Sequence, residues 1–599
     1  MQDGLAFLGV QQSVTGKKWQ QRSGSERLGL AIAQRLQLPE IVGVLLAGRG
    51  IAIDDALGFL TPTLRELLPD PLVIPGMDAG IARVLSALFK QEKIAIFGDY
   101  DVDGATSASL LKRFFDALDV PVRLYIPDRM LEGYGLNFKA MEQLHQEGIR
   151  LVITVDCGTS SVEVIAQALE IGLATVVIDH HVADANLPQA AAIINPNRLD
   201  TPADIRQSYG QLAAVGVAFL FLVGLNRALR QKNFYQGKRS EPDLRQWLDI
   251  VALGTICDVV PLTGLNRAFV SQGLKIMAQQ GNPGLKALMT VTALDQAPSA
   301  YHAGYVLGPR INAGGRIGTA DLGVRLLSTN DFLEAQGIAE QLHRLNQERQ
   351  ELEQKAFEEA LWMAKSQQFS QPTDILLVAS PLWHQGIIGI IAGRLKEHFH
   401  RPVFVVNLQD QIAKGSGRSV QGLDLGTAVI AARQAGLVQA GGGHPMAAGF
   451  TADASGLDPL KVFLNQHLRQ QARQVSYIPA MEIDGLLTAQ ALTPTLYQQI
   501  SQIGPFGNGN PEPRFAIADV RFLKTEIVAE KHVRCLAIGQ DRKSFKAMAF
   551  RAASLPLGQL LLKPHTLFHL AGTLRLNLWN DREDIQFIIE DAVVSDRQG

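Results

Sequence analysis

The stretch IAIFGDYDVDGATSASLL, at residues 94–111, decides the fold of this chain. It begins as an apolar run with β-branched residues and ends as a run with helical character. Between the two runs stand Asp99, Asp101 and Asp103 at alternate positions, followed by Gly104. Carboxylates gathered this closely repel one another unless a metal ion or a proton neutralises them. The stretch therefore predicts a strand, a divalent-cation site at its carboxyl end, and then a helix.

The composition is that of an ordinary globular protein of several domains. The length of 599 residues exceeds what one hydrophobic core supports, so we expect roughly two to four domains. Hydrophobic residues make up 47% of the chain and charged residues 19%, which argues against a disordered or coiled-coil protein. Because the net charge is only −2, any surface that binds nucleic acid must be local.

The cysteines and apolar segments indicate the compartment. Three cysteines, none in a Cys-x-x-Cys pair, exclude a disulfide scaffold and the usual zinc motifs, which suits a reducing cytoplasm. The N-terminus lacks the basic-then-apolar pattern of a signal peptide. The longest apolar run, residues 213–225, is shorter than the roughly 20 residues that span a membrane, and it predicts a buried helix. We expect a cytoplasmic protein that does not contact a membrane.

Strands alternate with helices from about residue 86, which is the pattern of a parallel sheet wrapped by helices. The predicted strands are KIAIFGD, VRLYIP, RLVITVD, ATVVID and AAIINP. Three of them end in aspartate, at Asp99, Asp156 and Asp179. Ligands of open α/β sheets bind at the carboxyl ends of the strands, so these carboxylates are expected to converge.

The chain is predicted to be an α/β protein with two α/β lobes joined by a long helix, plus a C-terminal β-barrel. The predicted parts are a helical leader, the first lobe, connecting helices, the second lobe and the barrel, at residues 1–85, 86–318, 319–371, 372–475 and 476–599. The leader shows no chemistry and is expected only to brace the first lobe. In the second lobe we expect strands at DILLVAS and PVFVVNL, and glycine-rich loops at WHQGIIGIIAGRL, KGSGRS and GGGHPMAAGF. The barrel is predicted from RFAIADVRFLKTEI, HVRCLAIG, FKAMAFR, TLFHLAGTLRLNLW and DIQFIIEDAVV.

Further acidic residues and imidazoles extend the predicted metal site. They are Asp156 in LVITVDCGTSS, Asp179, His180 and His181 in VVIDHHV, and Asp258 in ALGTICDVVPL. Each alone is more typical of a helix cap, a turn or a surface feature. Together, at what we predict to be successive strand ends, they indicate metal binding. Mixed carboxylate and imidazole ligation favours Mn²⁺, with Mg²⁺ as the competitor that prefers oxygen.

The ordered series of motifs resembles the DHH phosphoesterase superfamily and, within it, the RecJ family of single-strand-specific 5′→3′ DNA exonucleases. GDYDVDG, VDCG, DHH and DVVPL resemble the four metal motifs. GPRINAGGR, WHQGIIGIIAGRL, GSGRS and GGGHPMAAGF resemble the core of that family and its DHH-associated domain. IGPFGNGNPEPRF, at residues 503–515, looks like the start of its oligonucleotide-binding (OB) barrel. The resemblance spans nearly the whole chain.

The resemblance implies a catalytic centre with two divalent ions. One ion would take Asp99 and Asp101, the other Asp103, His180 and Asp258, and Asp156 would bridge them. His181 would face the scissile phosphate and donate to its oxygen. Asp179 would orient an imidazole rather than bind metal itself.

The residues beside these ligands raise two questions. Many superfamily members have a histidine ligand where Phe97 stands, and we assign that vacant role to Asp99. Cys157 and Cys257 adjoin the ligands Asp156 and Asp258. Because neighbours in a strand point to opposite faces, we predict that both cysteines are small buried residues rather than ligands.

The resemblance also implies residues that hold DNA. Arg129, Arg310, Ser416 and Arg418 match positions that look like phosphate and backbone contacts, since arginine forks and glycine-rich loops both bind phosphate oxygens. Arg310 could instead form a salt bridge between the lobes. His444 is expected to contact a backbone phosphate, or alternatively to satisfy its own glycine loop.

The barrel region carries the local positive charge that the whole chain lacks. Residues 514–563 contain ten Lys or Arg against four Asp or Glu. Four phenylalanines are interleaved with these charges, at Phe515, Phe522, Phe545 and Phe550. Most are expected in the core, and one or two could stack on bases.

Taken together, the motifs predict a metal-dependent single-stranded-DNA-specific 5′→3′ exonuclease that releases 5′-mononucleotides in DNA repair and recombination. The expected partners are single-stranded DNA with a 5′ end, a helicase and a single-strand-binding protein, and the resemblance suggests a monomer. One alternative is a DHH phosphodiesterase for oligoribonucleotides, cyclic dinucleotides or pyrophosphate. Another is a non-catalytic nucleic-acid-binding relative, which the full ligand set disfavours.

Overall fold

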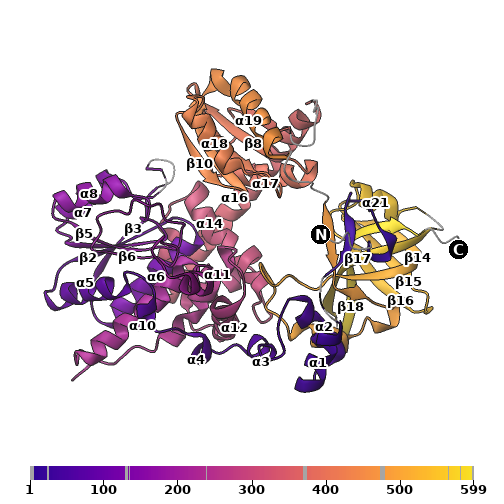
Figure 1. The fold of residues 1–599 in the computed structure, drawn as a ribbon, viewed down its shortest axis with the longest axis horizontal. Coiled ribbons are helices and arrows are strands. Elements are labelled where there is room, and N and C mark those ends of the chain that lie inside the picture. The colour runs from indigo at the N-terminus through magenta and orange to yellow at the C-terminus, as the bar shows by residue number, and fades with distance from the viewer. Residues whose placement is uncertain are drawn as a thin grey trace. The chain divides into compact units, whose positions relative to one another are not determined.

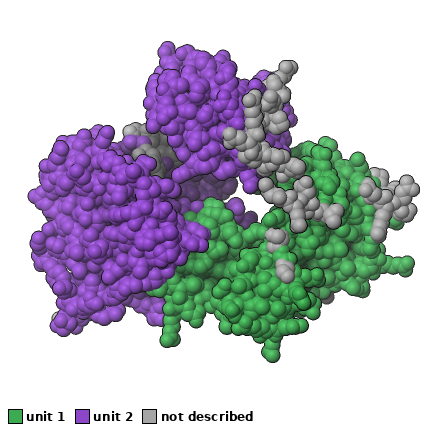
Figure 2. Space-filling model, in the orientation of Figure 1, with its two compact units in different colours: residues 1–68, 259–272, 478–599 green, residues 69–258, 273–477 purple. Residues whose placement is uncertain are grey.

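The fold comes from a computed structural model that describes residues 6–22, 24, 26–128, 132–133, 135–237, 239–367, 374–472, 479–563, 566–579 and 582–595. The chain forms two compact units (Figure 2). One contains residues 69–258 and 273–477, and the other contains residues 1–68, 259–272 and 478–599. The unit of residues 69–258 and 273–477 is called the α/β unit below, and the other is called the barrel unit. The five segment ranges given above stay a prediction.

The first sheet of the α/β unit has five parallel strands in the order β3-β2-β4-β5-β6. Their bounds are Ile94–Gly98 for β2, Val122–Tyr125 for β3, Leu151–Val155 for β4, Ala174–Ile178 for β5 and Ala192–Ile194 for β6. All five predicted strands are therefore confirmed. β2, β4 and β6 are buried throughout, as expected where helices cover both faces of a parallel sheet.

Helices cover both faces of this sheet (Figure 1). Ala95 and Phe97 pack in one cluster with α7 (Phe138–Gln146) and α8 (Val162–Glu170). The opposite face is covered by α5 (Met77–Phe89), α6 (Val102–Ala117) and α10 (Ala214–Gln231). α10 is long and apolar enough to cross a membrane, but 72% of it is buried inside the protein. The prediction of a buried helix at this run is confirmed.

Helices fill the chain between the two sheets of the α/β unit, and residues 264–272, the first part of one of them, belong to the barrel unit. Their bounds are Ala203–Tyr209 for α9, Leu248–Cys257 for α11, Gly264–Ala278 for α12, Pro283–Val291 for α13, Gly308–Ile317 for α14, Leu322–Ser328 for α15 and Phe332–Lys365 for α16. The predicted long helix is confirmed by α16, which has 34 residues and begins where the Asp331 side chain accepts hydrogen bonds from Leu333 N and Glu334 N. Its first part packs on α13, α14 and α15, and Ala356, Ala360 and Ala364 pack on the second sheet.

The second sheet has the order β10-β11-β9-β8-β7, in which β7 and β8 are parallel and the other pairs are antiparallel. The strands are Leu376–Ser380 for β7, Val403–Gln409 for β8, Ile412–Arg418 for β9, Ala440–His444 for β10 and Ala447–Asp453 for β11. α17 (Ile388–Phe399) packs with α16 on one face. α18 (Leu425–Gln434) and α19 (Leu457–Ala472) cover the other.

Three glycine-rich stretches of this lobe are not the loops that we expected. KGSGRS belongs to β9, GGGHPMAAGF forms the β10–β11 hairpin, and WHQGIIGIIAGRL contributes most of α17. A Cβ on Gly415 would lie 2.3 Å from the Phe450 ring, and one on Gly417 would lie 2.4 Å from the Phe404 ring. Glycine stands in β9 because aromatic rings occupy the space of its side chains.

The barrel unit contains a closed sheet with the strand order β14-β15-β16-β18-β17. β14 pairs with β15 and also with β17, so the first and last strands of this order join. The strands are Phe515–Val528 for β14, His532–Ile538 for β15, Ser544–Ala549 for β16, Leu567–Trp579 for β17 and Arg582–Val594 for β18. The five predicted strands and the predicted barrel are confirmed. Closure removes the unpaired edges that an open sheet of this size would expose.

Residues 6–68 of the predicted leader belong to this barrel unit, so the expectation that the leader only braces the first lobe is wrong for that part, whereas residues 69–85 lie in the α/β unit, where α5 packs on the first sheet. β1 (Lys18–Gln21) pairs in parallel with β12 (Ala480–Ile483). Trp19 is fully buried, and its indole Nε1–H donates to Asp591 Oδ2 at 2.9 Å. Residues of three N-terminal helices share the core of the barrel. The remaining helices and strands of the unit are α1 (Glu26–Leu36), α2 (Glu40–Gly48), α3 (Ala56–Leu60), α4 (Leu64–Leu67), β13 (Gly485–Leu486), α20 (Pro494–Ser501) and α21 (Pro556–Leu561).

Candidate metal centre

The turn from β2 to α6 holds the three alternate aspartates. Asp101 caps α6, and its Oδ1 accepts a hydrogen bond from Gly104 N at 3.0 Å. Asp99 and Asp103 are buried, with 3% and 2% of their surface exposed. A Cβ on Gly104 would lie 2.5 Å from the Asp99 backbone oxygen, so only glycine lets the helix start this close to the strand.

Asp103 joins this turn to the N-terminus of α10. Its two carboxylate oxygens accept hydrogen bonds from Ala214 N at 2.7 Å and Val215 N at 2.9 Å. Burial and the charges of Asp258 and Asp101 nevertheless raise the pKa of Asp103 well above its usual range, because they outweigh those two hydrogen bonds. A nearby cation would restore the carboxylate.

Asp156 follows β4 in a left-handed conformation, with φ at +60°. Its N–H donates to Ile178 O at 3.0 Å, which fixes the turn against β5. Burial, followed by the charges of Asp103, Asp101 and Asp99, raises the pKa of Asp156 well above its usual range. Non-glycine residues with positive φ are uncommon and cluster at functional sites.

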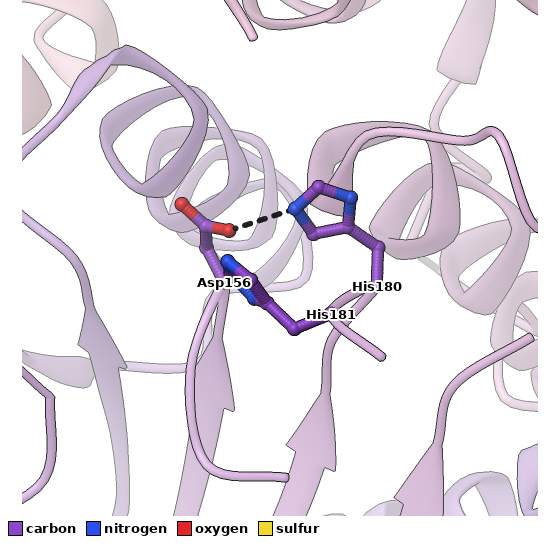
Figure 3. A group of neighbouring side chains, drawn as sticks. All are labelled: Asp156, His180 and His181. Carbon is purple, nitrogen blue, oxygen red and sulfur yellow. Dashed lines mark ion pairs between the residues drawn. The ribbon is translucent and has the colours of Figure 1, made fainter. Parts of the chain in front are cut away.

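The two neighbouring histidines differ in their protonation. Burial, and then the charge of His181, lowers the pKa of His180 to about 4, so this imidazole is neutral, as a metal ligand must be. Burial opposes the charging of His181, but a hydrogen bond and the charge of Asp179 raise its pKa to about 9. His180 Nε2 lies 3.3 Å from Asp156 Oδ1, and Figure 3 shows His181 beside the same carboxylate.

Asp179 organises the loop that carries both imidazoles. Its carboxylate accepts hydrogen bonds from Thr159 N at 3.0 Å and His180 N at 2.7 Å, and it contacts His181 Nδ1 at 2.7 Å. Burial alone would raise the pKa of Asp179, but these bonds and the two histidines hold it below its usual range. Asn195 donates to His181 O at 2.8 Å and so fixes the loop further.

Asp258 directly follows α11 rather than a strand, so the expectation of a strand end is wrong at this position. Its Oδ2 is buried, lies 3.7 Å from His180 Nδ1, and accepts no hydrogen bond within the part of the chain that the structure describes. Burial and the charge of Asp101 raise the pKa of Asp258 to about 7. A buried carboxylate oxygen that accepts no hydrogen bond is suited to bind a cation.

The side chains gather into three overlapping groups whose ligand atoms lie within 4.8 Å of one another. The groups are Asp99–Asp101–Asp156, Asp103–His180–Asp258 and Asp156–His180–His181. The first two follow the ligand sets implied by the resemblance, and Asp156 occurs in two groups. Buried acids with raised pKa values and a neutral imidazole fit divalent cations well. The assignment of each residue to an ion stays a prediction.

The residues predicted to hold DNA lie in two places within the α/β unit, and Arg129 lies outside the described residues. In β9, Ser416 Oγ and an Arg418 nitrogen would lie 3.0 and 3.3 Å from a Cβ on Gly389, in the first turn of α17. The positive end of a helix beside a guanidinium favours an anion. His444 is exposed and shares a row of the sheet with Ala447 and Arg418.

Arg310 lies in α14. It makes no salt bridge to any carboxylate of the described residues, so the alternative of a salt bridge between the lobes is wrong as far as those residues are concerned. Its Nε donates to His343 Nδ1 at 3.2 Å, and its Nη1 donates to Val306 O at 2.5 Å. Burial and the neighbouring Arg349 lower the pKa of Arg310. Its positive charge is thus available to an anion.

Comparison with known proteins identifies the family. Models described as the DHH family N-terminal domain, the DHHA1 domain and the RecJ OB domain match residues 93–255, 374–470 and 483–591. The single-stranded-DNA-specific exonuclease RecJ of Bacillus subtilis (strain 168) is 32% identical over 590 residues, which cover 97% of this chain and 71% of that protein. The chain belongs to the RecJ family. RecJ of Dickeya dadantii (strain 3937) is 37% identical over 508 residues, covering 83% of this chain and 87% of that protein.

Solved RecJ structures match the same architecture. The structure of RecJ in complex with Mn²⁺ from Thermus thermophilus is 28% identical, has a TM-score of 0.79, and covers 96% of this chain and 78% of that chain. The corresponding complex with Mg²⁺ is 27% identical, has a TM-score of 0.71, and covers 95% of this chain and 77% of that chain. The predicted family and fold class are confirmed.

A cavity beside the centre of this RecJ family member is lined by residues that sequence analysis did not single out. It has a volume of about 130 Å³, and its lining includes Asp128, Arg316 and His384. A Cβ on Gly315 would lie 2.7 Å from Tyr100 O, between two of the predicted ligands. Arg316 donates to Gly386 O at 2.9 Å, three residues before Gly389. Arg316 and His384 lie in the motifs GPRINAGGR and WHQG, but no local pattern marks these two residues as lining a cavity.

The cysteines of this RecJ family member occur in none of the three potential metal groups. Cys157 is 4% exposed and packs in the core beside α7 and α8. Cys257 is the last residue of α11, so the argument from alternating strand positions does not hold for it. A Cβ on Gly308 would lie 2.4 Å from Cys257 Sγ, which shows that helix α14 begins directly against this thiol.

Only one of the four phenylalanines considered in the RecJ OB region is well exposed. Phe515 and Phe545 are buried, and Phe522 packs against Phe568 with ring centroids 5.0 Å apart. Phe550 is 46% exposed, and the Arg575 guanidinium carbon lies 5.9 Å from its ring centroid. Phe550 is therefore the one of the four that could stack on a base.

In EDTA, we expect the unfolding temperature to fall as the pH rises from 6.5 to 8.5. Folded Asp103, Asp156, Asp258 and His181 hold protons that the unfolded chain releases, so stability is lost as pH rises through their raised pKa values. His180, whose pKa is lowered, makes stability rise with pH instead, but only below about pH 6.5.

Mn²⁺ at a hundred times its Kd should add about 2.7 kcal/mol per site to the free energy of unfolding. Differential scanning fluorimetry measures both effects, and a flat profile without an ion effect would contradict a carboxylate metal centre.

Proposed function

We propose that this protein is a single-stranded-DNA-specific exonuclease that hydrolyses phosphodiester bonds with two divalent ions. It would degrade DNA in the 5′→3′ direction and release 5′-mononucleotides during repair and recombination. The observation that carries this proposal is the convergence of Asp99, Asp101, Asp103, Asp156, His180 and Asp258 at one sheet edge of a RecJ family member. Relatives named single-stranded-DNA-specific exonuclease RecJ support the substrate.

The residues of the centre divide the work as follows. Asp99 and Asp101 would hold one ion, Asp103, His180 and Asp258 would hold the other, and Asp156 would be a ligand of both. When bound, divalent ions lower the pKa of water and stabilise the leaving oxygen of a phosphodiester. Mn²⁺ suits the imidazole ligand, and Mg²⁺ is the competitor.

In this proposal His181 faces the scissile phosphate and donates a hydrogen bond to its oxygen. Asp179 contacts its Nδ1 at 2.7 Å and keeps the ring protonated, which leaves Nε2–H to face the substrate. A charged donor gains strength as negative charge develops on the phosphoryl oxygen.

The 5′-terminal phosphate is proposed to bind Ser416, Arg418 and Arg310, with His444 on a backbone phosphate and Arg129 as a further contact. The first turn of α17 adds backbone N–H groups beside Ser416 and Arg418. The barrel, with Phe550 and its basic residues, would track the strand beyond the centre. A helicase and a single-strand-binding protein would supply the strand to a cytoplasmic monomer.

The decisive experiment is cleavage of single-stranded DNA labelled at either end, with Mn²⁺, EDTA and blunt-duplex arms. The proposal expects mononucleotide release from the 5′ end that EDTA abolishes and the duplex resists. Hydrolysis of short RNA or cyclic dinucleotides without activity on DNA would instead identify a small-substrate phosphodiesterase. Metal binding without hydrolysis of any substrate would identify a binding protein.

Replacing Arg418 by alanine should reduce the preference for 5′-phosphorylated over 5′-hydroxyl ends by about tenfold or more, because a charge-assisted bond is lost. Arg418→Lys should recover only part of the preference, since an ammonium cannot bind in a bidentate way. Arg433→Ala, on α18 of the same lobe, is the matched control and should leave it unchanged. Steady-state kinetics on both substrates measures the ratio. An unaltered ratio in Arg418→Ala would move the role to another residue.

A further inference from the structure

Two tyrosines of the α/β unit expose their rings side by side. Tyr301 is 54% exposed and Tyr305 is 75% exposed. Their ring centroids lie 5.3 Å apart with an angle of 28° between the planes, so the rings are stacked. Exposed aromatic surface is unfavourable in water and is typical of positions that meet a ligand.

The turn that carries Tyr305 is a π-helix, η4 (His302–Leu307). π-Helical turns are rare and occur often at functional sites, because they re-aim side chains at a cost in hydrogen-bond geometry. Ala303 and Leu307 of the same turn are fully buried. One side of the turn is thus anchored in the core while the tyrosines point outward.

This anchoring places the turn next to the metal centre. Cys257 Sγ contacts Ala303 O at 3.6 Å, and a Cβ on Gly304 would lie 3.2 Å from an Ile256 methyl carbon. Ile256 and Cys257 directly precede Asp258, a predicted ligand. The tyrosines therefore stand on an element packed against the end of the helix that presents Asp258.

The same helical stretch also offers positive charge for a phosphate. η4 continues into α14, where Arg310 donates to Val306 O, the residue next to Tyr305. A single nucleic-acid strand presents bases and phosphates in alternation, and proteins that bind it combine aromatic faces with cations. A helix-stabilising aromatic pair would explain the stacking of the rings, but not their place beside Arg310 and the metal centre.

We propose that Tyr301 and Tyr305 form a base-stacking platform for the single strand whose backbone Arg310 contacts. The platform rests on the proposed nuclease function and adds a surface that reads no sequence, because every base has a stacking face. Its contribution should depend on the presence of bases rather than on charge.

The test compares two oligomers of equal length in EDTA, oligo-dT and a fully abasic strand, by fluorescence anisotropy with the full-length protein. Tyr305→Ala should weaken binding of oligo-dT about tenfold or more and leave binding of the abasic strand unchanged. Tyr305→Phe should bind both strands like the wild type, and Tyr301→Ala should repeat the loss in part. Trp362→Ala, which removes an equally exposed aromatic ring (74%) on α16, is the matched control and should change neither affinity.

Each other result overturns the platform. Unchanged binding of oligo-dT by Tyr305→Ala would show that the rings do not meet bases. Equal losses on both strands would assign the effect to backbone contacts or to folding. A wild-type protein that binds neither strand and digests no DNA would refute the proposed function itself, whereas an active wild type with an unaffected Tyr305→Ala variant would refute the platform alone.

Discussion

Replacing Asp156 by asparagine is expected to lower nuclease kcat/KM by about a thousandfold or more while the fold stays intact. Asp156 occurs in two of the three potential metal groups and is the proposed ligand of both ions. Asparagine keeps the shape of the side chain, tolerates the left-handed backbone at φ +60°, and retains the N–H that donates to Ile178 O. Alanine would add backbone strain and so confuse the two effects.

The matched control is Asp119→Asn, because Asp119 is an exposed aspartate with a φ of +56° in the same unit. It should leave both turnover and stability unchanged. The measurements are single-strand digestion in Mn²⁺ and the Mn²⁺ affinity by calorimetry, which should fall together for Asp156→Asn. Turnover within tenfold of the wild type would contradict the bridging role.

Replacing Trp19 by alanine is expected to lower the free energy of unfolding by about 3–5 kcal/mol. The ring is fully buried in a cluster with Val10, Met481 and Ile483, and its indole N–H donates to the buried Asp591 carboxylate. The variant would leave a cavity and remove the partner of a buried charge, and both effects destabilise the barrel unit.

Urea denaturation followed by far-ultraviolet circular dichroism measures this loss. Trp362→Ala removes the same side chain from an exposed site and should change stability by less than about 0.5 kcal/mol. A loss as small for Trp19→Ala would mean that the N-terminal segment does not support the barrel. Asp591→Asn, which keeps an acceptor for the indole, should cost less than Trp19→Ala.

The sequence by itself determined the local elements and the groups that are predicted to bind metal. Short β-branched runs at residues 94–98 and 151–155 are strands because their apolar side chains must be covered on both faces. Since all five strands are parallel, their carboxyl ends share one edge, which is why Asp99, Asp156 and Asp179 could be predicted to converge. The order of the motifs then predicted the family.

Only the tertiary structure decided the features that depend on contacts between segments far apart in the sequence. β9 is a strand despite its glycines because Phe404 and Phe450, from other strands, fill the space beside them. The N-terminal segment joins the barrel because Trp19 meets Asp591, 572 residues away, and no local pattern encodes such a pair. Arg316 and His384 reach one cavity only once the helices are packed. Periodicity and turn chemistry act over a few residues, whereas these arrangements depend on which surfaces meet.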